Sequence, residues 1–62
     1  MSIKYIYLQS ALEALKADFL SPQDAEFVKR IQTLTKRQFA NLYAYKYNRL
    51  RSIHQKWLDH IG

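Results

Sequence analysis

The side chains best suited to chemistry in this 62-residue chain are two histidines and five acidic residues. Acid–base catalysis needs such groups close together, and a helical metal site uses ligands four residues apart. His54 and His60 are six residues apart, so on a helix they point about 120° away from each other. The acids are scattered, and one glycine, Gly62, cannot form a phosphate loop. We therefore predict a non-enzymatic protein with no catalytic residues, metal site, cofactor or small-molecule substrate.

Basic side chains are concentrated in the second half of the chain. Residues 1–28 carry two basic and four acidic side chains, a net charge of −2, whereas residues 29–62 carry eight basic side chains and one acid, a net charge of +7. This asymmetry indicates an anionic partner, because lysine and arginine neutralise phosphates and release their counterions. We predict binding to nucleic acid or to a nucleic-acid-processing complex; a solvated basic face that keeps the protein soluble is the alternative. The expected contact residues are Lys36, Arg37, Gln38, Asn41, Arg49, Arg51 and Lys56.

These residues must lie on helices, because the chain has only one glycine and one proline and therefore lacks the turn residues that strands and hairpins need. We predict a single all-α domain of three helices over about 3–19, 22–33 and 36–60, the last being the longest. The first helix is indicated by apolar residues at steps of four, three and four along one face. That inward stripe consists of Leu8, Leu12, Leu15 and Phe19. The second helix is expected to turn Phe27, Val28 and Ile31 inward.

The sequence contains two patterns that predict the start of a helix. Ser21 precedes Pro22, and Asp24 follows three positions later, which is typical of a capped helix with proline at its first position. Thr35 and Gln38 repeat this capping pattern. The second and third helices with their short turn resemble a helix-turn-helix, in which the later helix presents base-reading side chains.

The last helix is expected to bury one apolar seam, formed by Phe39, Tyr43, Leu50, Trp57 and Ile61. At about 1.5 Å per residue this helix is roughly 37 Å long and the middle one only about 18 Å, so its C-terminal half should overhang. Apolar side chains there would form an exposed patch unless the first helix or another chain covers them. We therefore predict a homodimer or a larger protein partner, as an inhibitor or adaptor would have. The expected interface residues are Tyr45, Arg49, Ile53, Trp57, Leu58 and Ile61.

Three tyrosines, at positions 43, 45 and 47, are interleaved with Lys46 and Arg49. Aromatic and basic side chains combined in this way could stack on unpaired bases of a single strand. On a continuous helix, however, Tyr43 belongs to the buried seam, Tyr47 to its border and Tyr45 to the outer face. Packing and a protein interface explain them more simply.

The setting expected from composition is the cytoplasm. There is no cysteine for a disulfide, and the apolar cluster near the start is too short for a secretion signal or a membrane span. The helix starts Leu20-Ser21-Pro22-x-Asp24 and Leu34-Thr35-x-x-Gln38 resemble those of small helical proteins from bacteriophages and mobile elements. That resemblance implies a bacterial or viral setting and a role in modulating nucleic-acid machinery. No membrane partner is expected, because the apolar faces are needed for the core.

Overall fold

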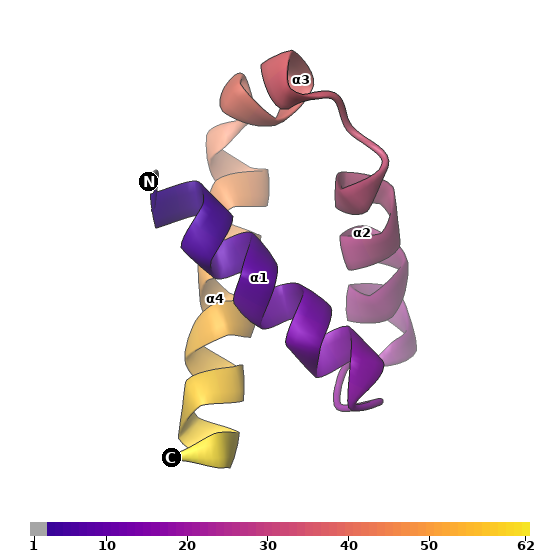
Figure 1. Ribbon diagram of the computed structural model, residues 1–62, viewed down its shortest axis with the longest axis vertical. Helices are drawn as coiled ribbons and strands as arrows, with labels where there is room; N and C mark the ends of the chain where they lie inside the picture. Colours follow the sequence, from indigo (N-terminus) through magenta and orange to yellow (C-terminus); the bar gives the residue numbers. More distant parts are fainter. Residues whose placement is uncertain (1–2) are drawn as a thin grey trace.

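Four α-helices make up the computed structural model, which describes residues 3–62. They are α1 (Ile3–Lys16), α2 (Pro22–Gln32), α3 (Lys36–Ala40) and α4 (Ala44–Ile61). In Figure 1, α2 and α4 stand on opposite sides of the molecule, α1 runs diagonally across them, and α3 joins them at one end. The all-α prediction is confirmed. The count of three helices is wrong, because the predicted 36–60 helix is divided into α3 and α4.

The first helix ends three residues before its predicted boundary. Asp18 has a φ of 56°, in the left-handed region that ends helices, and glycine usually occupies such a position. The Phe19 amide donates to the Ala14 carbonyl at 3.0 Å, and the Asp18 amide donates to the Leu15 carbonyl at 3.1 Å. These two bonds form a Schellman motif. The turn directs Phe19 onto α4, where its ring centroid lies 5.4 Å from that of Trp57.

The two predicted helix starts are confirmed. The Ser21 hydroxyl accepts a hydrogen bond from the Asp24 amide at 3.3 Å, with Pro22 in the first turn of α2. At the start of α3, the Thr35 hydroxyl accepts from the Gln38 amide at 3.2 Å, and the Gln38 side chain accepts from the Thr35 amide at 3.0 Å. This reciprocal capping box satisfies two amides that would otherwise lack partners.

The break between α3 and α4 lies at residues 41–43. The Asn41 side-chain amide donates to the Arg37 carbonyl at 3.0 Å, and the Lys4 ammonium donates to the Ala40 carbonyl at 2.8 Å. The Asn41 backbone amide also donates to the Arg37 carbonyl, at 3.1 Å, so this carbonyl ends the helix with two donors, while Lys4 satisfies the Ala40 carbonyl. Tyr43 is extended, with φ −62° and ψ 149°, and 68% of it is exposed. Its predicted place in the buried seam is therefore wrong.

The core lies between α1 and the other helices. The face of α1 that packs against α4 and α2 is centred on Tyr7, Ala11 and Ala14, of which the two alanines are fully buried. The predicted stripe of Leu8, Leu12 and Leu15 flanks this centre and is only partly buried. Small side chains at the centre let the helix backbones approach closely. The other buried side chains are Val28, Ile31, Phe39, Leu50, Ile53 and Trp57.

The predicted overhang of the last helix is wrong, because α1 covers its C-terminal half. Trp57 is only 8% exposed, and its indole nitrogen donates to a Glu13 carboxylate oxygen at 3.3 Å. Ile53 is 2% exposed. The apolar side chains of this half that stay exposed are Leu58 and Ile61. The argument for a homodimer from an uncovered seam therefore loses its basis, and the homodimer itself stays a prediction.

Replacing Trp57 tests this burial. We expect Trp57→Ala to lower the free energy of unfolding by about 3–5 kcal/mol, which matches the total that a core of this size supplies, so the variant should be largely unfolded. Trp57→Phe keeps a ring in the core but loses the donor to Glu13 and part of the indole volume, so it should cost about 1–2 kcal/mol, less than Trp57→Ala. Far-ultraviolet circular dichroism shows whether Trp57→Ala is folded, and urea unfolding measures the cost of Trp57→Phe. A Trp57→Ala protein as stable as the wild type would contradict the buried position.

Substitution of Asp18 tests the helix end. We expect Asp18→Gly to raise the free energy of unfolding by about 0.5–1 kcal/mol, because glycine adopts positive φ without strain and a negative charge leaves the negative end of α1. Asp18→Asn removes the charge alone and should give part of this gain. Asp18→Val should destabilise, since branched side chains clash in this conformation. Thermal melts of the three variants make the comparison, and a stable Asp18→Val protein would contradict the assigned backbone.

Candidate nucleic-acid interface

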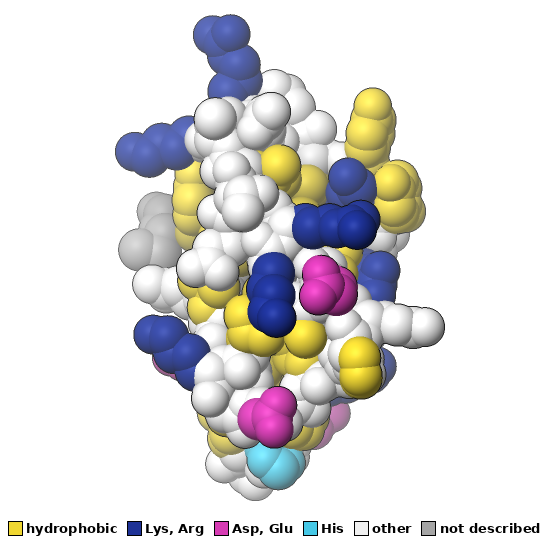
Figure 2. Space-filling model, turned by 90° about the vertical axis from the view of Figure 1, so that its right-hand side faces the viewer, with side chains coloured by type: hydrophobic (Ala, Val, Ile, Leu, Met, Phe, Trp, Pro, Cys, Tyr) yellow, Lys and Arg dark blue, Asp and Glu magenta, His cyan; other side chains and the backbone are white. Residues whose placement is uncertain are grey.

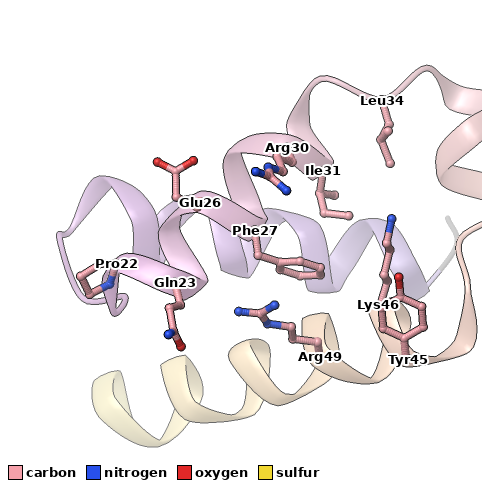
Figure 3. A pocket seen from close by; sticks show the side chains of 10 residues that line it. All are labelled: Pro22, Gln23, Glu26, Phe27, Arg30, Ile31, Leu34, Tyr45, Lys46 and Arg49. Carbon is pink, nitrogen blue, oxygen red and sulfur yellow. The ribbon is translucent and has the colours of Figure 1, made fainter.

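A groove runs between α2 and α4. Its cavity volume is about 680 Å³, and Phe27, Ile31 and Leu34 supply apolar surface along it. Figure 3 shows α2 and α4 as its two walls, with α1 passing behind. Cationic side chains also line the groove, and the acid among the lining residues, Glu26, points away from α4. The complete lining is Pro22, Gln23, Glu26, Phe27, Arg30, Ile31, Leu34, Tyr45, Lys46 and Arg49.

Arg49 bridges the two walls of the groove. Its guanidinium carbon lies 4.5 Å from the centroid of the Phe27 ring, and a guanidinium nitrogen lies 3.1 Å from an Asp24 carboxylate oxygen. The Arg49 side chain is 43% exposed and that of Asp24 is 21% exposed, so water screens this ion pair partly. The sequence predicts Arg49 both as a nucleic-acid contact and as a protein anchor. Its intramolecular partners instead give it the task of positioning α2 against α4.

Two cations at the groove were not among the predicted contacts. Arg30 projects from α2 and is exposed, whereas Lys46 projects from α4 and is half-buried. The Lys46 ammonium lies 5.8 Å and 5.9 Å from the ring centroids of Tyr43 and Tyr45. Sequence reasoning assigned Lys46 to the edge of the seam and gave Arg30 no site. Their proximity to one groove depends on how α2 and α4 are paired, which no local pattern indicates.

The exposed tyrosines lie beside this groove. Tyr43 and Tyr45 are each 68% exposed, their ring centroids are 6.1 Å apart, and the ring planes differ by 12°. Tyr47 behaves differently, because its ring packs against Tyr7 with centroids 5.6 Å apart. Partial burial raises the pKa of Tyr47 above its ordinary value, a hydrogen bond with Tyr7 adds to the effect, and Arg51 opposes it. Tyr47 thus belongs to the packing, as predicted, whereas Tyr43 does not.

The seven predicted nucleic-acid contacts do not form one site. Lys36 and Arg37 are exposed on α3, but Gln38 and Asn41 use their side chains to cap the two ends of that helix. Arg51 lies on the flank of α4 that faces Tyr47 and α1, away from the groove. The remaining two predicted contacts are Arg49, described above, and Lys56, which lines a smaller cavity together with Phe19 and Ile53.

The six predicted protein-interface residues are also divided. Burial removes Ile53 and Trp57 from the surface. Tyr45, Leu58 and Ile61 are exposed. Tyr45 and Leu58 are thirteen residues apart, about 20 Å along the helix, and differ by roughly 140° around it. These side chains therefore do not make one continuous patch.

The two histidines have packing partners. The Nδ1 atom of His54 lies 2.7 Å from the Ser10 hydroxyl oxygen, and its ring centroid lies 4.7 Å from that of Tyr7. The His60 ring centroid lies 4.5 Å from that of Phe19. Across residues 3–62, there is no cluster of three or more histidine or acidic side chains that could hold a metal ion.

Comparisons of the chain with protein-family models, curated proteins and solved structures found no match. The resemblance to small bacteriophage and mobile-element proteins therefore stays a prediction. In the part of the chain that the structure describes, none of the helices combines the length and the apolar character needed to cross a membrane.

Substitution of Arg49 tests its bridging role. We expect Arg49→Ala to lower the free energy of unfolding by about 1 kcal/mol, because a partly screened ion pair and a cation–π contact are both lost. Arg49→Lys keeps the charge opposite Asp24 but loses the flat contact with Phe27, so its effect should be smaller. Lys56→Ala removes an exposed cation from the same helix and serves as control, with an expected change within about 0.5 kcal/mol. Equal effects of Arg49→Ala and Lys56→Ala in urea unfolding would contradict the bridge.

Proposed function

We propose that the protein is a non-enzymatic nucleic-acid-binding protein that uses a groove face, defined here as Arg30, Lys46, Tyr43 and Tyr45 around the α2–α4 groove. The observation that carries the proposal is the charge of this groove: Arg30 and Lys46 line it, whereas Glu26 turns away and Asp24 is paired with Arg49. Glu26 precedes Arg30 by four residues on α2 and so lies near it, but the lining as a whole holds three cations, Arg30, Lys46 and Arg49, against this one acid. A groove with a net positive charge is suited to phosphate groups. A cytoplasmic setting is part of the proposal.

The wider surface favours the same partner. Lys36 and Arg37 are exposed on α3, which joins α2 to α4 at one end of the molecule. Figure 2 shows Lys and Arg side chains distributed over the side that α2 occupies, with hydrophobic surface and some acidic side chains between them. A net charge of +5 adds long-range attraction to a polyanion, which raises the rate of association at low salt.

Base reading by a helix-turn-helix is not part of this proposal. The order of α2, turn and α3 is that of the motif, but α3 has only five residues. The side chains predicted to read bases, Gln38 and Asn41, are occupied in capping α3. Binding is therefore proposed to depend mainly on phosphates and little on base sequence.

Salt-dependent binding of the purified protein to labelled oligonucleotides tests the proposal. We expect dissociation constants in the micromolar range at low salt, by fluorescence anisotropy, rising steeply between about 50 and 200 mM salt because counterions are released. Arg30→Glu and Lys46→Glu should each weaken binding about tenfold or more and should reduce the salt dependence.

The matched control is Arg51→Glu, which makes the same change in net charge on the other flank of α4. Its effect should be small at 150 mM salt, where separated surface charges are largely screened. If all three variants weaken binding equally, net charge rather than the groove face is responsible. Absence of binding at low salt would contradict the proposal and would direct attention to a protein partner.

A further inference from the structure

The exposed pair Tyr43 and Tyr45 is not explained by the fold. Burying a tyrosine ring normally stabilises a small protein, and leaving two of them in water forgoes that stabilisation. Both are 68% exposed, although Tyr7 and Phe39 of the same chain are buried. The two rings are nearly parallel, with planes that differ by 12°, and the Lys46 ammonium lies near both of them. Aromatic surface of this kind is suited to contact with another flat ring.

The backbone break produces this pair. A continuous helix would carry Tyr43 into the buried seam, whereas the extended conformation at residue 43 carries it out to the surface. Tyr43 is the N-cap residue of α4, yet its side chain makes no capping hydrogen bond. Serine, threonine or asparagine would cap α4 better. The tyrosine at this position therefore needs another reason, and a ligand would supply one.

Charge beside the rings identifies the kind of ligand. The Lys46 ammonium is almost equidistant from the two ring centroids, at 5.8 Å and 5.9 Å, and Arg30 lines the same groove from the opposite wall. Proteins that bind single strands combine aromatic rings, on which unpaired bases stack, with cations that contact the phosphates. A duplex keeps the faces of its bases stacked inside and offers mainly phosphates and groove edges.

We propose that the ligand of the groove face is single-stranded nucleic acid, with an unpaired base stacked on the Tyr43–Tyr45 pair and adjoining phosphates at Lys46 and Arg30. This inference rests on the proposed function and narrows it to one class of nucleic acid. The cavity of about 680 Å³ falls within the ordinary size range of small-molecule sites, so it has room for one nucleotide of the strand.

Three ligands of equal length separate stacking from charge: a twelve-nucleotide oligothymidine, an abasic strand with the same phosphates, and a duplex. We expect oligothymidine to bind about ten times more tightly than the abasic strand at 100 mM salt, because only oligothymidine has bases to stack. Tighter binding of the duplex, or equal binding of the two single strands, would overturn the stacking inference and leave the proposed nucleic-acid binding intact. No binding of any of the three would overturn both.

Variants of the tyrosines locate the stacking. Tyr43→Leu and Tyr45→Leu should raise the dissociation constant for oligothymidine about ten- to a hundredfold and change that for the abasic strand less than about twofold. Tyr43→Phe and Tyr45→Phe keep the rings and should bind like the wild type. Ile61→Ala is the control, because it removes an apolar side chain that is 57% exposed at the other end of α4.

Folding of each variant is checked by circular dichroism. Leucine variants that bind oligothymidine like the wild type would overturn the inference, as would an equal loss of binding to the oligothymidine and abasic strands.

Discussion

The close packing of α1 across α2 and α4 is the contact on which the other features depend. The chain contains no cysteine, so side-chain packing must hold 62 residues together. Ala11 and Ala14 are fully buried at the centre of the contact, and their small size brings the helix backbones near each other. The groove opens between α2 and α4 on the side away from α1, and its floor shares Ile31 with the core.

Backbone turns, rather than residue type, decide which aromatic side chains are buried and which are exposed. Tyr7 and Tyr47 pack together, and Phe19 reaches Trp57 because a left-handed residue turns the chain at the end of α1. Tyr43 is exposed because the chain is extended where α3 gives way to α4. The turn at Asp18 therefore places Phe19 in the core, and the break at residues 41–43 places Tyr43 on the groove face.

Local chemistry in the sequence predicts the starts of α2 and α3, but not the early end of α1 or the break between α3 and α4. Ser21 and Thr35 act within three residues of themselves, so the sequence alone reveals their role. Asp18 ends α1 in a left-handed conformation that usually requires glycine, and no residue pattern in the sequence predicts this conformation. Asn41 ends α3 together with Lys4, which donates to the Ala40 carbonyl from 36 residues away in the chain. Of the groove face, sequence reasoning considered Tyr43, Tyr45 and Lys46 for base stacking and favoured packing instead. It missed Arg30, which reaches the same groove only because α2 and α4 are paired.

The pairing of the first and last helices also governs when the protein can fold. Glu13 and Trp57 are hydrogen-bonded across 44 residues of chain, and Ser10 contacts His54 across the same separation. Contacts between distant residues raise the entropic cost of closing the chain and slow folding relative to bundles with local contacts. During synthesis, α1 emerges before α4. Tyr7, Ala11 and Ala14 of α1 therefore stay exposed to solvent until α4 can pack against them. Folding on the ribosome must therefore wait until α4 has emerged, and a chain interrupted before Trp57 would expose its apolar core to proteases.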